Sequence, residues 1–124
     1  MSNVIYTPDA PAAIGPYSQA IVAGGLVFTS GQIPINPATG SIEAVTIEEQ
    51  SEQVCKNIKA VLEASGSSLE KVVKTVCFLS DMNDFAAFNA VYANYFTGKP
   101  ARSCVAVKTL PKNVLVEVDT IAEV

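Results

Sequence analysis

Hydrophobic positions along the chain follow two periods, one typical of β-strands and one of amphipathic helices. Residues 20–23 and 26–29 are two short apolar runs, and the Gly24-Gly25 pair between them predicts a β-hairpin. Residues 30–40 contain two prolines and two glycines and are expected to form an irregular loop. Residues 72–79 are apolar on both faces, which predicts a central strand covered on two sides.

The first predicted helix begins with a capping box. Thr46 can accept a hydrogen bond from the amide of Glu49, while the Glu49 side chain can reach back to the amide of Thr46. Apolar residues then follow at helical spacing. Gly66 is placed to end this helix in the left-handed conformation.

The second predicted helix begins near Asp81 or Asn83 and ends before Gly98 and Pro100. One stripe of this helix holds five aromatic residues and a single polar residue, Asn89. The stripe consists of Phe85, Phe88, Asn89, Tyr92, Tyr95 and Phe96.

Two further strands, at residues 102–108 and 114–122, are separated by a turn at 110–113. Two helices can cover only one face of a sheet with four or more strands. Because the strands are apolar on both faces, the uncovered face would promote aggregation, and self-association is the simplest remedy. The pattern therefore predicts a single α+β domain over residues 1–124, with two helices packed on one face of its sheet and binding clefts between subunits.

Composition and charge limit the choice of partners. The chain has 124 residues, enough for one core, and only 16% are charged, which indicates that some surface is hidden in a partner. The net charge of −4 and the eight scattered Lys and Arg residues disfavour nucleic acid as a ligand. Neither a secretion signal nor a membrane-spanning apolar run is recognisable, so we expect a cytoplasmic protein.

Histidine is absent, which removes the most common general base and metal ligand. Cys55, Cys77 and Cys104 are far apart and odd in number, so neither a disulfide framework nor a zinc site is indicated. Any catalysis must use carboxylates, tyrosine, cysteine, lysine, arginine or backbone groups.

Arg102 is the main candidate for a ligand contact. Strand alternation places it on one face with Cys104 and Ala106. Its planar guanidinium can bind a carboxylate, and a nearby backbone amide could add a second donor. An alternative of equal weight is an arginine that lies along the surface or pairs across the sheet.

Glu117 lies in the middle of an apolar strand. Burial there would raise its pKa and suit it to orient or deprotonate a water molecule. The alternation of the strand favours a simpler interpretation, a solvent-facing residue on the same side as Asp119.

Several other residues are weaker candidates. Asn89 interrupts the aromatic stripe and needs a polar partner, which is more often structural than a ligand. Tyr17 follows a turn and could cover a ligand with its ring, although ordinary packing is more common. Ser30 and Gly31 lie where a strand enters a loop, and the backbone of Gly31 could approach a ligand closely. Cys104 could be a nucleophile, but nothing obvious would activate it, so an inert apolar role is favoured.

Four blocks of the sequence run nearly from end to end: APAAIGPYSQA, FTSGQIPINPATG, VVKTVCFLSDMNDFAAFNAVYANYF and PARSCVAVKTLPKNVLVEVDTIAEV. Together they resemble the Rid family, also called YjgF or the reactive-intermediate imine deaminases. The resemblance implies a chorismate-mutase-like domain with a mixed β-sheet. It also implies a homotrimer with clefts between its subunits.

The resemblance further implies hydrolysis of 2-imino acids, such as 2-iminobutanoate and 2-iminopropanoate, to 2-oxo acids and ammonia. Arg102 would hold the substrate carboxylate with help from the backbone at Cys104, and Glu117 would orient the attacking water. An imine is already electrophilic, so this chemistry needs no metal or cofactor. Other positions that line the family's cleft match Tyr17, Ser30, Gly31 and Asn89.

The main alternative is a non-catalytic regulatory trimer that binds a small ligand. Members of the family also carry translation-inhibitor, endoribonuclease-like and chaperone-like descriptions, so an activity of that kind is a further alternative. The acidic balance disfavours RNA cleavage, and the presence of both Arg102 and Glu117 favours imine hydrolysis. Two departures stand out. The connection at 97–99 is shorter than in many relatives, which bears on the pocket rim and on substrate size, and Asn113 stands where glycine is frequent.

Overall fold

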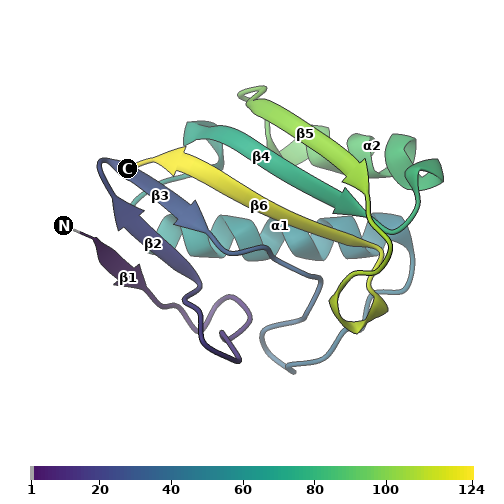
Figure 1. The fold of residues 1–124 in the computed structure, drawn as a ribbon, viewed down its shortest axis with the longest axis horizontal. Coiled ribbons are helices and arrows are strands. Elements are labelled where there is room, and N and C mark those ends of the chain that lie inside the picture. The colour runs from purple at the N-terminus through teal and green to yellow at the C-terminus, as the bar shows by residue number, and fades with distance from the viewer. Residues whose placement is uncertain (1) are drawn as a thin grey trace.

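Six strands form one sheet in the computed structural model, which describes residues 2–124 and so leaves out the first residue of the predicted domain. The order across the sheet is β1-β2-β3-β6-β4-β5, and every neighbouring pair is antiparallel except β4 with β5. The sheet is therefore mixed, as the resemblance implies (Figure 1). The strands are β1 Asn3–Ile5, β2 Ala20–Ala23, β3 Leu26–Thr29, β4 Val72–Leu79, β5 Ala101–Ala106 and β6 Val116–Glu123.

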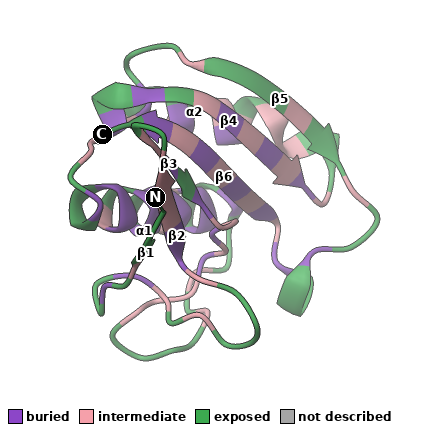
Figure 2. Cartoon of the chain, turned by 60° about the vertical axis from the view of Figure 1, so that its left-hand side comes forward, coloured by how far each residue is buried: buried purple, intermediate pink, exposed green. Residues whose placement is uncertain are grey.

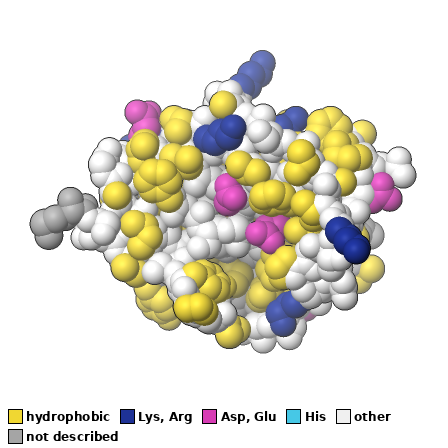
Figure 3. All heavy atoms as spheres, in the orientation of Figure 1, with side chains coloured by type: hydrophobic (Ala, Val, Ile, Leu, Met, Phe, Trp, Pro, Cys, Tyr) yellow, Lys and Arg dark blue, Asp and Glu magenta, His cyan; other side chains and the backbone are white. Residues whose placement is uncertain are grey.

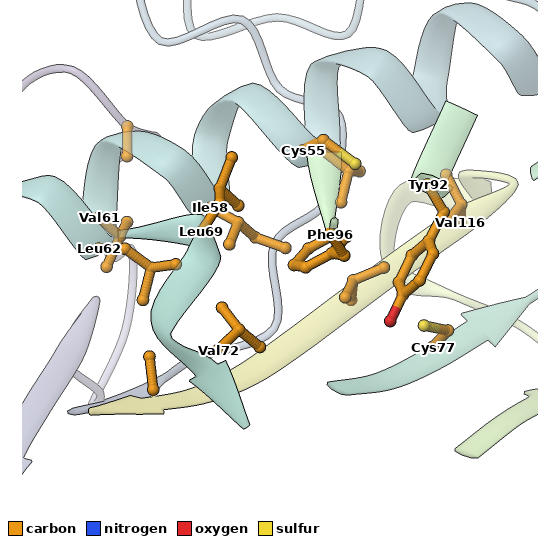
Figure 4. Packing of buried hydrophobic residues seen from close by; sticks show 14 of the residues in the cluster. Cys55, Ile58, Val61, Leu62, Leu69, Val72, Cys77, Tyr92, Phe96 and Val116 are labelled. Carbon is orange, nitrogen blue, oxygen red and sulfur yellow. The ribbon is translucent and has the colours of Figure 1, made fainter. Parts of the chain in front are cut away.

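Two helices, α1 Ile47–Ala64 and α2 Phe85–Tyr95, pack on one face of this sheet. Both lie behind the strands in Figure 1. Figure 4 shows the core between the two layers, where Ile58 and Leu62 of α1 meet Leu69 and Val72. The predicted α+β fold with both helices on one face is confirmed.

The hairpin and the first helix agree with their sequence signals. Gly24 and Gly25 have φ angles of 60° and 78°, which favour glycine in the turn between β2 and β3. The Thr46 Oγ1 accepts a hydrogen bond from the Glu49 amide at 3.1 Å, and a Glu49 carboxylate oxygen accepts one from the Thr46 amide at 3.1 Å. Gly66 follows the helix with a φ of 81°.

The second helix starts later than the sequence predicts. The carboxylate of Asp81 accepts a hydrogen bond from the amide of Asn83 at 2.8 Å and so caps a 3-10 turn, Met82–Asp84, which precedes α2. The last two strands also differ from prediction, since β5 ends at Ala106 and β6 begins only at Val116.

Another 3-10 turn, Pro111–Asn113, occupies the connection between β5 and β6. Asn113 there has a φ of 56°, a conformation that glycine adopts most easily and that Asn tolerates better than most residues. Asn113 can therefore replace the glycine that is frequent here, because asparagine tolerates this backbone conformation.

The two faces of the sheet have different environments. The side chains of β6 alternate between buried positions facing the helices and half-buried positions on the other face (Figure 2). Within the described chain no helix covers that second face, so β4 is covered on one side and not on two as predicted. We call this second face the open face; its side chains include Ile21, Phe28, Val76, Phe78, Val105, Glu117, Asp119 and Ile121.

Candidate functional site

Arg102 lies on the helix-covered side of the sheet, at its edge. In the parallel pairing of β5 with β4, Arg102 is opposite Thr75 and Cys104 is opposite Cys77. Thr75 and Cys77 are buried beneath the helices, so Arg102 and Cys104 share that face, as strand alternation predicts. β5 is one of the two edge strands of the sheet and most of it is exposed (Figure 2), including Arg102.

The guanidinium of Arg102 is held by the aromatic stripe of α2. Its Nη1 donates a hydrogen bond to Oδ1 of Asn89 at 2.7 Å. Its Cζ lies 4.8 Å from the ring centroid of Tyr92 and 5.4 Å from that of Phe85, within the range of cation–π attraction. Asn89 thus has the polar partner that its place in an aromatic stripe requires, and Arg102 is oriented in advance of any ligand.

A cavity of about 540 Å³ opens beside this guanidinium. Its volume is in the range of small-molecule sites. Two cationic side chains and no acidic side chain line it, so the cavity suits an anionic ligand. The lining residues are Asn89, Tyr92, Ala93, Phe96, Thr97, Lys99, Pro100 and Arg102.

The backbone amide of Cys104 faces the free edge of the sheet. Beyond the end of β5, the amide of Val107 donates to the carbonyl of Leu79 at 2.9 Å. Alternate residues of a parallel strand direct their amides to the same side, so the amides of Ser103 and Val105 also face β4. The amide of Cys104 then points away from β4, where it is available to a ligand on the side of Arg102.

The thiol of Cys104 is poorly suited to nucleophilic attack. Burial raises its pKa, and this outweighs the lowering by Arg102 and by a hydrogen bond with Cys77. Burial likewise raises the pKa of the Cys77 thiol to about 12. Both sulfurs are therefore protonated near neutral pH, in keeping with an inert role for Cys104.

Glu117 lies on the open face, across the sheet from the guanidinium. Its half-buried carboxyl has a raised pKa, first because of burial and second because of the negative charge of Asp119 on the same face. A Cβ atom added to Gly31 would come within 2.9 Å of the carboxyl carbon of Glu117. Gly31 therefore provides the space in which this carboxyl group lies.

The segment that follows Tyr17 is hydrogen-bonded to Ser30, the residue before Gly31. The Ser30 hydroxyl donates to the carbonyl of Ser18 at 2.6 Å, and the Ser30 amide donates to the carbonyl of Gln19 at 2.9 Å. These bonds place the segment after Tyr17 beside Gly31 and hence beside Glu117. Tyr17 as a whole residue is 53% exposed, which is unusual for a packing tyrosine.

The candidate residues thus form two groups on opposite faces. The Arg102 group comprises Asn89, Arg102 and Cys104, and the Glu117 group comprises Tyr17, Ser30, Gly31 and Glu117. In register, Arg102 is level with Thr75, while Glu117 is level with Phe78. Two strand spacings separate the groups across the sheet and three residues separate them along it, about 10 Å in each direction.

The sequence pattern does not identify several neighbours of these two groups. Phe85 and Tyr92 are predicted only as members of the aromatic stripe, although their rings flank Arg102. Lys99 was noted only as part of a short connection, and Asp119 only as a residue on the same side as Glu117. Each of these four residues lies close in sequence to a candidate residue or on the same predicted face of its helix or strand. That proximity is the signal in the sequence that could identify them.

Residues 2–124 show neither a candidate metal site nor a candidate membrane-spanning helix. No group of three or more His, Cys, Asp or Glu side chains is arranged to hold a metal ion. No helix in this range has the length and apolar character required to cross a membrane.

Comparison with known proteins gives consistent matches over the whole fold. A family model described as Endoribonuclease L-PSP matches residues 7–124. A RutC family protein of Pyrococcus horikoshii is 56% identical over 123 residues, which cover 98% of each chain.

Solved structures give the same result. A protein of the conserved Rid family from Yersinia pestis is 51% identical with a TM-score of 0.97, covering all of both chains. E. coli TdcF, solved with bound serine, is 43% identical with a TM-score of 0.94 over 98% of both chains. On the strength of these matches along its whole length, the chain belongs to the Rid family, known also by the names YjgF and RutC.

Proposed function

We propose that this protein hydrolyses 2-imino acids, such as 2-iminobutanoate and 2-iminopropanoate, at clefts between the protomers of a homotrimer. Arg102 of one protomer binds the substrate carboxylate and Glu117 of the next activates water. One observation carries this proposal: the sheet separates the Arg102 group from the Glu117 group. The Arg102 group offers a carboxylate anchor without a base, and the Glu117 group offers a base without a carboxylate anchor. Two copies placed edge to open face would complete a single site.

The Arg102 group is suited to bind a carboxylate. A guanidinium has five N–H donors, and the 2.7 Å bond to Asn89 uses only one of them. The amide of Cys104, which faces the free edge, adds a donor on the same side of β5. No acidic side chain lines the adjoining cavity to compete for the charge.

The Glu117 group is suited to move protons. Water adds to the imine carbon, forming a C–O bond, while the π electrons of the C=N bond take up a proton from the solvent at nitrogen. The C–N bond then breaks as the new hydroxyl group releases its proton to the solvent and becomes the C=O group, and ammonia leaves while the 2-oxo acid remains. The ionised carboxylate of Glu117 accepts a proton from water, and its raised pKa lets it return that proton to the departing nitrogen.

The open face provides the surface for assembly. Figure 3, drawn in the orientation of Figure 1, shows acidic groups near its centre among many hydrophobic side chains. Phe28 and Val105 on this face are 42% and 46% exposed in the single chain. Burying such apolar side chains against another copy is favourable, and it would also remove water from around Glu117.

The serine bound by the related TdcF supports the choice of substrate class. Serine carries a carboxylate and a nitrogen on the adjacent carbon, the same pair of groups that a 2-imino acid presents. A site that accepts one is of a size and polarity that can accept the other.

The test generates 2-iminobutanoate in solution with a threonine dehydratase and follows 2-oxobutanoate formation with and without the protein. We expect acceleration by the wild type and a loss of at least about 100-fold in the Arg102→Ala variant, because the carboxylate loses its charged partner. Arg102→Lys keeps the charge without the planar fork and should recover only part of the rate. Size-exclusion chromatography with light scattering should give three chains for all variants.

Two results would reject this proposal. Equal rates with and without the protein, together with binding of 2-oxobutanoate, would indicate a regulatory trimer that binds without catalysis. RNA cleavage by the purified protein, abolished in Arg102→Ala, would indicate the endoribonuclease activity that the family description names.

A further inference from the structure

The cavity beside Arg102 carries a second cation that carboxylate anchoring does not use. Lys99 lines the same cavity as Arg102, three residues earlier in the chain. A monocarboxylic imino acid needs one cationic anchor, and the Arg102 group already supplies it. The remaining ammonium group is therefore available for a different part of the ligand.

The backbone of Lys99 is held in a costly conformation. Its φ of 52° lies in the left-handed region, which glycine adopts freely and other residues adopt at some cost. The amide of Lys99 donates to the carbonyl of Phe96 at 3.4 Å, and a Cβ atom on the preceding Gly98 would lie only 3.2 Å from the carbonyl of Glu70. Strained residues of this kind cluster at ligand clamps, where their side chains must be presented in one direction.

Two aromatic side chains line the cavity together with the two cations. The rings of Tyr92 and Phe96 are stacked, with their centroids 4.5 Å apart and an angle of 26° between their planes. Such a lining favours a short carbon chain with a charged group at each end. The cavity volume of about 540 Å³ exceeds what a four-carbon monoanion requires.

We propose that the preferred substrate of this site is a 2-imino dicarboxylic acid, with its C1 carboxylate on Arg102 and its distal carboxylate on Lys99. The inference rests on the proposed function and names the substrate class of the same site. Lys99 is a specificity residue that binds and takes no part in the chemical steps. The hydrolysis yields a 2-oxo dicarboxylic acid and ammonia, with water as the only other reactant.

The experiment compares two imines on the intact protein. An aspartate oxidase supplies 2-iminosuccinate and a threonine dehydratase supplies 2-iminobutanoate, and oxaloacetate and 2-oxobutanoate are measured. We expect a higher kcat/KM for 2-iminosuccinate in the wild type. Lys99→Gln should lower that value by about tenfold, as for the loss of one charge-assisted contact, and should lower the value for 2-iminobutanoate less. Lys99→Arg should recover most of the difference.

Lys112 offers a matched control. It is another exposed lysine, with a φ of 56°, in the Pro111–Asn113 turn and outside the residues that line the cavity. Lys112→Gln changes the net charge by the same amount and should leave the ratio of the two kcat/KM values unchanged. A shift in that ratio equal to the shift in Lys99→Gln would assign the effect to the overall charge and overturn the inference.

The outcomes separate this inference from the proposed function. Hydrolysis of 2-iminobutanoate with no preference for 2-iminosuccinate, or equal losses on both in Lys99→Gln, would overturn the inference and leave the deaminase intact. Hydrolysis of neither imine would reject the deaminase. In that case calorimetric titration with oxaloacetate and 2-oxobutanoate decides: weaker binding of oxaloacetate alone in Lys99→Gln supports a dianion site, and equal affinities reject it.

Discussion

The chemistry available to Glu117 depends on the charge around its carboxyl group. Burial and Asp119 both disfavour the ionised form, so Glu117 retains a proton at a pH at which an exposed glutamate has lost it. Asp119 is itself half-buried, and its pKa is raised by that burial. The charge of Asp119 therefore influences the ionisation of Glu117, whereas the pKa of Asp119 is raised by burial.

Asp119→Asn is expected to extend activity to lower pH. In the proposed mechanism the ionised form of Glu117 accepts the proton from water, so kcat/KM should fall as the pH drops through the pKa of this residue. Removing the negative charge of Asp119 lowers that pKa, and the acid limb of the profile should move to lower pH. Profiles of kcat/KM against pH check this, with Glu123→Gln at the exposed end of the same strand as control. A limb that stays in place would show that Asp119 does not influence Glu117.

Gly31→Ala should impair catalysis without impairing the fold. The new Cβ would collide with the Glu117 side chain, lying 3.2 Å from its Cγ and closer to its carboxyl group, while the φ of Gly31 lies outside the left-handed region. We expect kcat/KM to fall by about 100-fold, because a displacement of about 1 Å can have that effect.

Gly24→Ala should have the opposite effect, a loss of stability without a loss of activity. Its Cβ meets nothing within 4 Å, but its φ of 60° strains the hairpin, so it should lower the melting temperature and spare activity. Steady-state kinetics and thermal melts of both variants distinguish the two effects. Unchanged kinetics in Gly31→Ala would exclude close packing between position 31 and the active carboxyl group.

At the scale of elements, the sequence predicts those features that depend only on neighbouring residues. The two-glycine hairpin and the capping box at Thr46 were located correctly because each depends on neighbouring residues. β1 was not predicted, since its three residues, Asn3–Ile5, form a strand only by pairing with β2. α2 was placed too early because the Asp81 cap begins a 3-10 turn, which helical periodicity does not distinguish from the helix.

The arrangement of the candidate site depends on pairings that the sequence does not encode locally. Alternation correctly placed Arg102 with Cys104, and Glu117 with Asp119. Whether those two sets share a face depends on the register of β5 and β6 on β4, strands separated by a helix and a turn. The opposition of Arg102 and Glu117 therefore required the structure.

Asn57 connects α1 to the loop that follows Gly31. Its Nδ2 donates to the carbonyls of Ile33 and Ile35 at 3.1 and 2.9 Å, and the residue is buried. Asn57→Leu leaves both acceptors without this partner, and we expect the free energy of unfolding to fall by about 2 kcal/mol. Urea denaturation at one fixed protein concentration measures it, with the exposed neighbour substitution Lys56→Ala as control. An effect no larger than that of the control would contradict the prediction.

At the scale of the whole molecule, the composition and the open face both indicate that the chain associates with other copies of itself. A chain with only 16% charged residues has little polar surface, and its open face carries partly exposed side chains such as Phe28 and Val105. Assembly through this face would bury those side chains and bring Glu117 of one copy towards another. The same contact would then serve both stability and catalysis.

Coexpression of two inactive variants tests this arrangement. Arg102→Ala and Glu117→Gln should each be inactive alone, but a mixed trimer contains some sites with an intact Arg102 and an intact Glu117. Random mixing of equal amounts should restore about a quarter of wild-type activity. Differently tagged chains allow the mixed trimers to be isolated. No recovery in them would place both groups of a site on one chain, contrary to the geometry.

The sheet that separates Arg102 from Glu117 works as a partition inside every chain. No rotation of side chains can bring the two groups through it, so under the proposed mechanism a single chain would hold both groups without a complete site. We expect specific activity to vanish on extreme dilution and to return on concentration. A molecule that binds the open face and prevents assembly would accordingly inhibit the protein without occupying the substrate cavity.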